Sequence, residues 1–322
     1  MKKVKQVNIV FMMSALMPYI AFLILDITGF QIRTGVGQIL FSQIVFALPA
    51  VIYLIVCGTN PFKALRVKRI KISNVFLLIL FAYLIMPLIS LINAISLVFS
   101  QNEIVGTITN VTDNSPLIVG ILTVGLLPAI LEESVYRGVL YNEYRKANPK
   151  IAIFLSALLF GLLHQNLNQF SYAFALGLIF ALVIEATDSI LSTMILHFVI
   201  NSTSLVMNYM LPRILKAMEA FVGSDVMNAE EVLESALEGA DKVTMIQSAY
   251  SLIVPAIISS ILAFIVYRVI AKNENRYEEV KNIFARNESN SRLLSFISVP
   301  LVIGVGICIY NIIVLLVSVK LS

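Results

Sequence analysis

The chain has little charge, only two cysteines and only two histidines. Charged residues make up 13% of its 322 residues and hydrophobic residues 59%, whereas about a quarter of a soluble domain is charged. This balance excludes an ordinary soluble protein. Cys57 and Cys308 are lone residues in separate apolar runs, so we expect no disulfide. No low-complexity linker and no soluble domain interrupts the sequence.

Several familiar catalytic motifs are also missing. The sequence contains neither the Gly-x-Ser-x-Gly motif of α/β-hydrolases nor the His-Glu-x-x-His motif of zinc proteases, and it has no convincing serine–histidine dyad. The net charge of +4 is spread over several short loops. It therefore reflects membrane topology and predicts no nucleic-acid partner.

Long apolar runs recur along the whole chain. Runs of about 20 residues match a hydrocarbon core about 30 Å thick, and their continuous apolar character differs from the alternating pattern of a β-barrel. The expected fold is an all-α, polytopic transmembrane bundle of about nine spans. The predicted spans are 8–30, 35–57, 74–99, 116–138, 150–165, 170–186, 189–211, 244–270 and 293–319.

Basic residues alternate between the two sides of this arrangement. Eighteen of the 23 lysines and arginines lie in the N-terminal segment or in loops 58–73, 137–150 and 268–292. The positive-inside rule makes this side cytoplasmic, with the N-terminus inside and the C-terminus outside. The first apolar run is too long for a signal peptide, and no small-x-small site follows it, so we expect a retained first span.

Two loops carry enough charge to need an interpretation. The outer loop 212–243 is acidic and also contains apolar residues such as Val232 and Leu237. It is interpreted as a solvated helical loop, with a lid over a substrate entrance as the alternative. The inner loop 272–292 carries both signs of charge and predicts a solvated cytoplasmic helix.

A polar cluster stands at the end of the fourth apolar run. Glu133 and Arg137 are four residues apart on a helix and can form an ion pair. Glu132 lies about 100° away, on a face shared with Tyr136. One carboxylate could thus be held by its arginine while the other handles protons. The alternative is a helix end where these charges meet the lipid headgroups.

The two histidines lie in later apolar runs. His164 follows Phe160 by four residues, and His197 precedes Asn201 by four, so each pair shares a helix face. Polar side chains within membrane spans are costly and tend to be functional. Either histidine alone could merely bond a neighbouring helix. Together with the carboxylate pair, they favour a site formed by spans four, five and seven.

The ordered set Glu-Glu-x-x-x-Arg (132–137), Phe-x-x-x-His (160–164) and His-x-x-x-Asn (197–201) resembles the three motifs of a known family. This is the CPBP (CAAX-prenyl endopeptidase and bacteriocin-processing, or Abi) family of intramembrane proteases. The resemblance covers about residues 115–210. It divides the chain into N-terminal transmembrane helices (1–114), a catalytic core (115–211), and an acidic outer loop with C-terminal helices (212–322). Asp188 departs from the glycine usual at that turn.

The resemblance implies roles for the residues of the three motifs. Glu132 would be the general base that activates water, and His164 would help to hold that water. His197 and Asn201 would orient it or stabilise the oxyanion. Glu133, Arg137, Phe160 and Tyr136 would support the site. The cofactor is either absent or one divalent metal, with zinc the candidate and Glu132, His164 and His197 its ligands.

The depths of these residues in the membrane conflict with the resemblance. If the fourth span ends near residue 138, Glu132 lies about 10 Å from the cytoplasmic boundary, whereas His164 lies about 20 Å from it. The two side chains meet only if the fourth helix runs deeper or the fifth is tilted or short.

The expected function is that of an intramembrane endopeptidase acting on a membrane-associated peptide or protein. The expected surroundings are the lipid bilayer of a bacterial plasma membrane. A non-enzymatic bacteriocin-immunity or scaffold protein is the alternative. A proton-coupled transporter is a third hypothesis, but the sequence lacks the inverted repeat and broken-helix pairs of such folds.

Overall fold

The computed structural model describes residues 2–58, 60–100, 104–223, 228, 242–285 and 293–321, and this part of the chain is helical without strands. Lipid cannot satisfy backbone polar groups, so a chain that crosses it repeatedly must form helices or a closed barrel. The longest helices are α1 (Lys2–Thr28), α2 (Gly35–Val56), α4 (Ile72–Leu97), α10 (Leu167–Thr187), α11 (Ile190–Val222), α13 (Lys242–Asn273) and α15 (Val299–Leu321).

The prediction of about nine spans agrees with these helices. In the described part of the chain, eight helical stretches are long and apolar enough to cross a membrane, and α9 (Pro149–Leu162) is a shorter apolar helix. The protein is therefore a multi-pass helical membrane protein. The predicted boundaries differ most at the fourth span, which continues to Arg145, and at the seventh, which continues to Val222.

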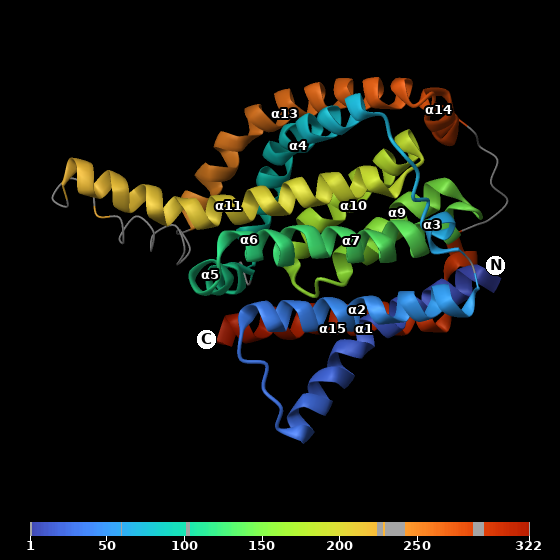
Figure 1. The fold of residues 1–322 in the computed structure, drawn as a ribbon, viewed down its shortest axis with the longest axis horizontal. Coiled ribbons are helices and arrows are strands. Elements are labelled where there is room, and N and C mark those ends of the chain that lie inside the picture. The colour runs from blue at the N-terminus through green and yellow to red at the C-terminus, as the bar shows by residue number, and fades with distance from the viewer. Residues whose placement is uncertain are drawn as a thin grey trace.

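The helices form three layers (Figure 1). One layer contains α1, α2 and α15, and the opposite layer contains α4 packed along α13. The middle layer contains the fourth span with α9, α10 and α11. Beyond Pro18, α1 diverges from the bundle, and its side chains there, such as Ile27, are largely exposed.

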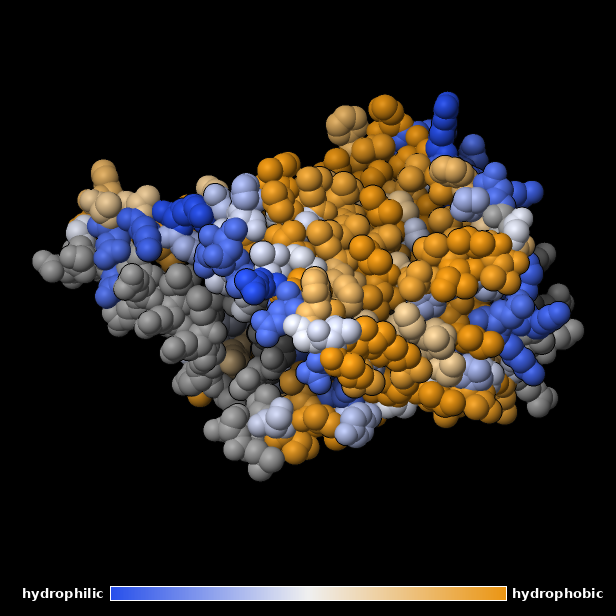
Figure 2. Space-filling view, turned by 60° about the horizontal axis from the view of Figure 1, so that its bottom comes forward, coloured by the Kyte–Doolittle hydropathy of each residue, from blue (hydrophilic) through white to orange (hydrophobic). Residues whose placement is uncertain are grey.

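The outer surface suits a bilayer. Figure 2 shows a broad apolar band with polar residues gathered toward its ends. Several isoleucines on α13, such as Ile261, are more than half exposed, which in water would be costly but in lipid is favourable. The α13 helix has an exposed face of this kind along much of its length.

The fourth span is one continuous helical rod built from short segments. It contains α6 (Leu117–Gly120), the π-helical η1 (Ile121–Leu126), α7 (Leu127–Glu133), the π-helical η2 (Ser134–Tyr141) and α8 (Asn142–Arg145). Because the rod continues to Arg145, Glu132 lies about 20 Å from that end by helix rise. The predicted end at residue 138 was wrong, and with it the apparent mismatch in depth disappears.

The fifth span is short because strong capping signals bound it. Asn148 caps the start of α9 by accepting hydrogen bonds from the backbone amides of Lys150 and Ile151, at 3.0 and 3.2 Å. Asn166 caps α10 in the same way. Between them Gln165 adopts a left-handed conformation with φ 54°. His164 therefore lies in this turn, not within a helix as the sequence pattern predicted.

A buried ionic cluster joins several segments at the end of the bundle that carries the basic loops. The Glu185 carboxylate is fully buried and accepts a hydrogen bond from the Tyr141 hydroxyl at 2.8 Å. Three arginines surround the same carboxylate: Arg66, Arg145 and Arg276. The cluster holds the loop before α4, the end of the fourth span and the turn after α13 against α10.

Asp188, in the turn between α10 and α11, forms a second ionic contact with the same loop. Its backbone is left-handed (φ 54°), a conformation that aspartate tolerates better than most residues. Its carboxylate pairs with Arg66 and Lys68. Burial raises the pKa of Asp188, but hydrogen bonds from Lys68 and Arg66 outweigh burial and lower this pKa below its usual value of 3.8.

Replacing Asp188 with Asn should reduce stability only while the aspartate is ionised. A carboxylate whose pKa is lowered by folding stabilises the native state above pH 3.8, and this contribution disappears as pH falls through the folded-state pKa. The thermal midpoint of Asp188→Asn in detergent should therefore lie below that of the parent at neutral pH and converge with it in acid. Asn tolerates the same backbone conformation. A difference that is constant with pH would assign the effect to the turn.

The two charged loops differ in how far the structure describes them. The inner loop contains α14 (Tyr277–Ala285), which confirms the predicted helix there. Residues 224–227 and 229–241 lie outside the described residues, and with them most of the acidic outer loop that was predicted to be helical. The first part of the predicted loop, residues 212–222, continues α11 as helix.

Candidate functional site

Glu132 faces a cavity of about 210 Å³ within the helical bundle. It is the last but one residue of α7, and 15% of its side chain is exposed. Tyr136, one turn later, lines the same cavity, as the predicted helix face requires. The other lining residues come from α1, α2 and the turn after α9; they are Ser14, Pro18, Ser42, Gln43, Phe46, Leu163, His164 and Gln165.

Gln43 on α2 holds one oxygen of the Glu132 carboxylate. Its side-chain amide donates a hydrogen bond to Glu132 Oε1 at 2.9 Å. The carboxylate can only accept there, so the amide nitrogen must be the atom that faces it. This bond fixes the orientation of the Glu132 carboxylate through Oε1 and does not involve Oε2. The sequence interpretation missed Gln43, because a single glutamine in an apolar run carries no motif.

The predicted ion pair of Glu133 and Arg137 is present, and both side chains are almost completely buried. Arg137 Nη1 lies 3.1 Å from Glu133 Oε1, and Nη2 lies 3.4 Å from the carbonyl oxygen of Gly177 on α10. The guanidinium also lies over the Phe160 ring, 4.4 Å from its centroid. These contacts lock the carboxylate that faces away from the cavity.

His197 lies between the two carboxylates. Its Nδ1 is 3.0 Å from Glu133 Oε1, and its Nε2 is 3.9 Å from Glu132 Oε2. The first distance is a hydrogen bond and the second is too long for one. Glu133 therefore orients the imidazole so that Nε2 points toward Glu132. His197 itself does not line the cavity; it approaches Glu132 from α11.

His164 is also held through Nδ1. This atom lies 2.8 Å from the backbone carbonyl oxygen of Phe160, which can only accept, so Nδ1 carries the proton. In neutral His164, Nε2 is therefore a free acceptor. The Phe160 ring packs edge-on against His164, His197 and Tyr136, at centroid distances of 5.1, 6.1 and 4.9 Å. Phe160 thus spaces the two imidazoles.

The predicted catalytic residue Asn201 lies away from the cavity. Its amide donates a hydrogen bond to the carbonyl oxygen of Val124 at 3.2 Å. Val124 lies in η1, where the wide turn changes the usual backbone pairing. Asn201 does not line the cavity. Its observed contact joins α11 to the fourth span.

The metal alternative needs three ligands close together. In the described part of the chain, no group of three or more His, Cys, Asp or Glu side chains lies close enough to hold a metal ion. Glu132 Oε2 and His197 Nε2 are 3.9 Å apart, and Gln43 already occupies Glu132 Oε1. The side chains as placed do not form the ligand set predicted for zinc.

A second polar cluster borders the cavity near the turn after α9. The Tyr19 hydroxyl and the Asn311 amide both donate to Gln165 Oε1, at 2.8 and 3.0 Å. These contacts bring α1 and α15 to the cavity rim. Neither helix belongs to the segment that carries the motifs, so no local pattern could indicate this part of the site.

The fold and the cavity together define a class of protein: a polytopic helical membrane protein with a carboxylate–imidazole site inside the bundle. A comparison with family models agrees with this class. Residues 114–203 match the family of type II CAAX prenyl endopeptidase Rce1-like proteins. This match confirms the resemblance indicated by the three motifs.

The match supports a function of the intramembrane CAAX-protease kind and suggests protease activity. It covers less than a third of the chain, and α1, α2, α4, α13 and α15 lie outside it. Comparisons with curated proteins and with solved structures gave no match. Gln43, which contacts Glu132 directly, therefore comes from outside the matched segment.

Proposed function

We propose that the chain is an intramembrane endopeptidase that hydrolyses a peptide bond in a membrane-associated peptide or protein, with Glu132 as the general base. The observation that carries the proposal is the placement of Glu132. Its carboxylate faces a cavity within the bundle, and Gln43 holds one of its oxygens. The catalytic core is residues 115–211, and the preceding helices α1 and α2 complete the cavity.

In this mechanism, a water molecule in the cavity transfers a proton to Glu132 and its oxygen attacks the carbonyl carbon of the scissile bond. The C–N bond then breaks, and the proton on Glu132 passes to the leaving nitrogen. His164 accepts a hydrogen bond from the water through Nε2. A base in this role contributes about 10²- to 10⁴-fold to the rate.

Negative charge develops on the carbonyl oxygen during the attack, and a hydrogen-bond donor is needed to stabilise it. Protonated His197 would supply one through Nε2, because Glu133 already holds its Nδ1. Each preorganised donor of this kind contributes about 10²- to 10³-fold. Asn201 supports the site by holding α11 to the fourth span through Val124.

Two polar atoms in the wall of the cavity lack hydrogen-bond partners within the described part of the chain, which favours a cavity that contains water. Gln43 Oε1 and the Tyr136 hydroxyl are buried and have no hydrogen-bond partner among the described residues. An unsatisfied buried polar atom costs about 1–3 kcal/mol. A water molecule that pairs with these atoms would recover that energy.

The proposed location is the plasma membrane of a bacterium, with the N-terminus in the cytoplasm. The described parts of the basic loops lie at one end of the bundle, where the Glu185 cluster also lies. Positive residues are retained on the cytoplasmic side. In a bacterial membrane, the substrate class would be leader peptides, bacteriocins or signalling propeptides.

Substrates can be identified by comparing membrane peptides from cells that express the parent protein and cells that express Glu132→Gln. Peptides whose intact form accumulates only with the variant are candidate substrates. Equal peptide profiles, together with an unchanged cellular phenotype, would reject the protease and favour the scaffold. Solute flux in sealed vesicles without peptide turnover would favour transport.

Replacing Gln43 with Leu should lower kcat about 10- to 100-fold with little change in KM. A hydrogen bond to a charged group is worth about 1.5–3 kcal/mol. The bond from Gln43 positions the Glu132 carboxylate for catalysis and is not itself a contact with the substrate. Purified protein and an identified substrate peptide allow both constants to be measured. Ser42→Ala is the matched control, because Ser42 lines the same cavity but bonds the backbone of Ile39. A loss seen only in KM would make Gln43 a substrate contact.

A further inference from the structure

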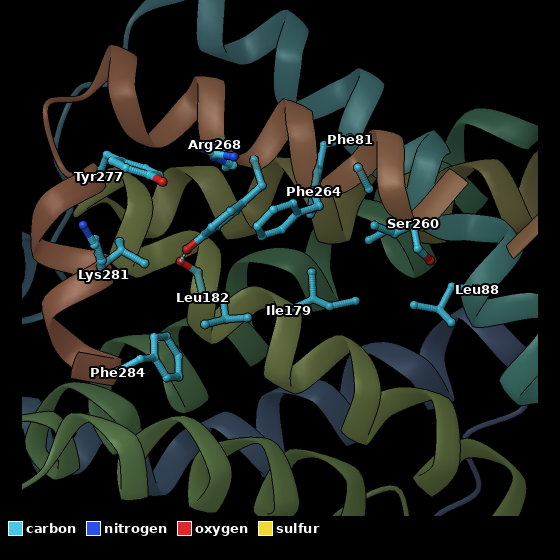
Figure 3. A pocket seen from close by; sticks show the side chains of 14 residues that line it. Phe81, Leu88, Ile179, Leu182, Ser260, Phe264, Arg268, Tyr277, Lys281 and Phe284 are labelled. Carbon is cyan, nitrogen blue, oxygen red and sulfur yellow. Dashed lines mark hydrogen bonds between the residues drawn. The ribbon is translucent and has the colours of Figure 1, made fainter. Parts of the chain in front are cut away.

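A second, larger hollow lies on the side of the bundle formed by α4, α10, α13 and α14. Its volume is about 460 Å³, within the range of about 300–1,000 Å³ typical of small-molecule sites. None of its lining residues lines the Glu132 cavity. Most of the lining is apolar and includes Phe81, Ile179, Leu182 and Phe264 (Figure 3). We call this hollow the α13 groove.

The charges in the α13 groove have one sign only. Arg268 and Lys281 line it, and no carboxylate does. Arg268 forms no ion pair among the described residues, and its guanidinium lies 5.3 Å from the centroid of the Tyr277 ring. Lys281 is 3.9 Å from Glu278, but both side chains are about two-thirds exposed or more. Such an exposed pair contributes little.

The position of Lys281 on α14 is unusual for an amphipathic helix. Tyr277, Val280, Lys281 and Phe284 all line the α13 groove, and their spacing places them on one helix face. The acidic residues of α14, Glu278 and Glu279, do not line it. A lysine on the apolar face of this helix, turned toward an apolar groove, indicates an anionic group at that end.

Arg268 lies near the end of α13, where a membrane-spanning helix reaches the lipid headgroups. Arg268 is five residues before the end of α13 at Asn273, which is about 8 Å by helix rise. Ser260, at the opposite end of the groove, lies about 12 Å deeper along the same helix. Figure 3 shows Tyr277 and Lys281 at one end and Ser260 and Leu88 at the other. The groove therefore runs from a cationic rim into the hydrocarbon region.

We propose that the α13 groove binds one anionic phospholipid, with its phosphate at Arg268 and Lys281 and an acyl chain along Phe264 and Ile179. In such a phospholipid the phosphate would lie at the cationic end of the groove, and the acyl chain would follow the apolar lining deeper into the bilayer. Near a membrane surface, each lysine or arginine adds about a fivefold preference for anionic lipid. This site does not depend on the proposed protease function.

The absence of tryptophan from the chain allows a direct test. Phe264→Trp places a single fluorophore in the groove, and Ile265→Trp places one at nearly the same depth of α13 but outside the lining. Each protein is reconstituted in mixed phosphatidylglycerol and phosphatidylcholine bilayers in which only one of the two lipids carries brominated chains. Bromine quenches the fluorescence of a tryptophan that it contacts.

Brominated phosphatidylglycerol should quench the tryptophan at position 264 more strongly than brominated phosphatidylcholine does, whereas position 265 should show no preference. Removing either cation, with Arg268→Gln or Lys281→Gln, should reduce the preference about fivefold. Equal quenching by both lipids, or a preference that survives removal of both cations, would overturn the proposal. So would protection from both lipids, which would mean that something else fills the groove. Helix content by circular dichroism verifies that each variant is folded.

Discussion

Glu132→Gln is expected to abolish peptide hydrolysis while expression and membrane insertion persist. The amide cannot accept the proton of the attacking water, and loss of a general base lowers the rate about 10²- to 10⁴-fold. Gln has nearly the same volume as Glu and can still pair with Gln43. The cavity of about 210 Å³ should therefore keep its shape. The rate is measured on purified protein with an identified peptide.

Glu143→Gln is the matched control for this experiment. Glu143 lies on the same rod as Glu132, but it pairs with Lys146 and does not line the cavity. This variant should cleave the peptide within about twofold of the parent, because Glu143 lies outside the cavity and an amide oxygen at this position can still accept a hydrogen bond from Lys146. If Glu132→Gln cleaved as fast as Glu143→Gln, the assignment of the base would be wrong, although the fold and the α13 groove would be unaffected.

Arg137→Met is expected to cause the largest loss of stability of any single change at the site. It leaves Glu133 buried without its arginine, and breaking a buried pair from one side costs about 3–5 kcal/mol. The guanidinium also contacts the Gly177 carbonyl on α10 and the Phe160 ring on α9, so its removal deletes one contact of the fourth span with each of these helices. The measurement is the thermal unfolding midpoint in detergent.

Removing both charges should restore stability without restoring activity. In Glu133→Leu/Arg137→Met both partners of the buried ion pair are removed together, and replacing such a pair by apolar residues is often neutral. His197 then loses the acceptor that orients its Nδ1, so peptide hydrolysis should stay low. A double variant as unstable as Arg137→Met alone would mean that packing of the arginine, and not its charge, stabilises the site.

Much of the site could be predicted because its patterns are local. The pairing of Glu133 with Arg137 follows from their spacing on one helix, and the same geometry places Glu132 and Tyr136 on another face. The histidines were recognisable because imidazoles are rare in apolar runs. The match of residues 114–203 with the Rce1-like family agrees with these patterns.

Other parts of the site depend on contacts between residues that are distant along the chain. Gln43 meets Glu132 across 89 positions, and Asn311 meets Gln165 across 146. The Glu185 cluster brings together arginines from three separate segments. No periodicity or spacing indicates such pairs, because they depend on how the helices pack.

By itself, the sequence determined the approximate number of membrane spans, the candidate topology and the ion pair within the fourth span. Lipid forces apolar runs into helices, and a helix fixes which neighbours share a face. The tertiary structure decided how deep Glu132 lies, which side chains hold it and which helices line the cavity. Those features depend on the continuation of the fourth helix to Arg145, on the turn after α9 and on the packing of α1 and α2 beside them. The physical reason is that such packing is set by side chains that meet only after the bundle has formed.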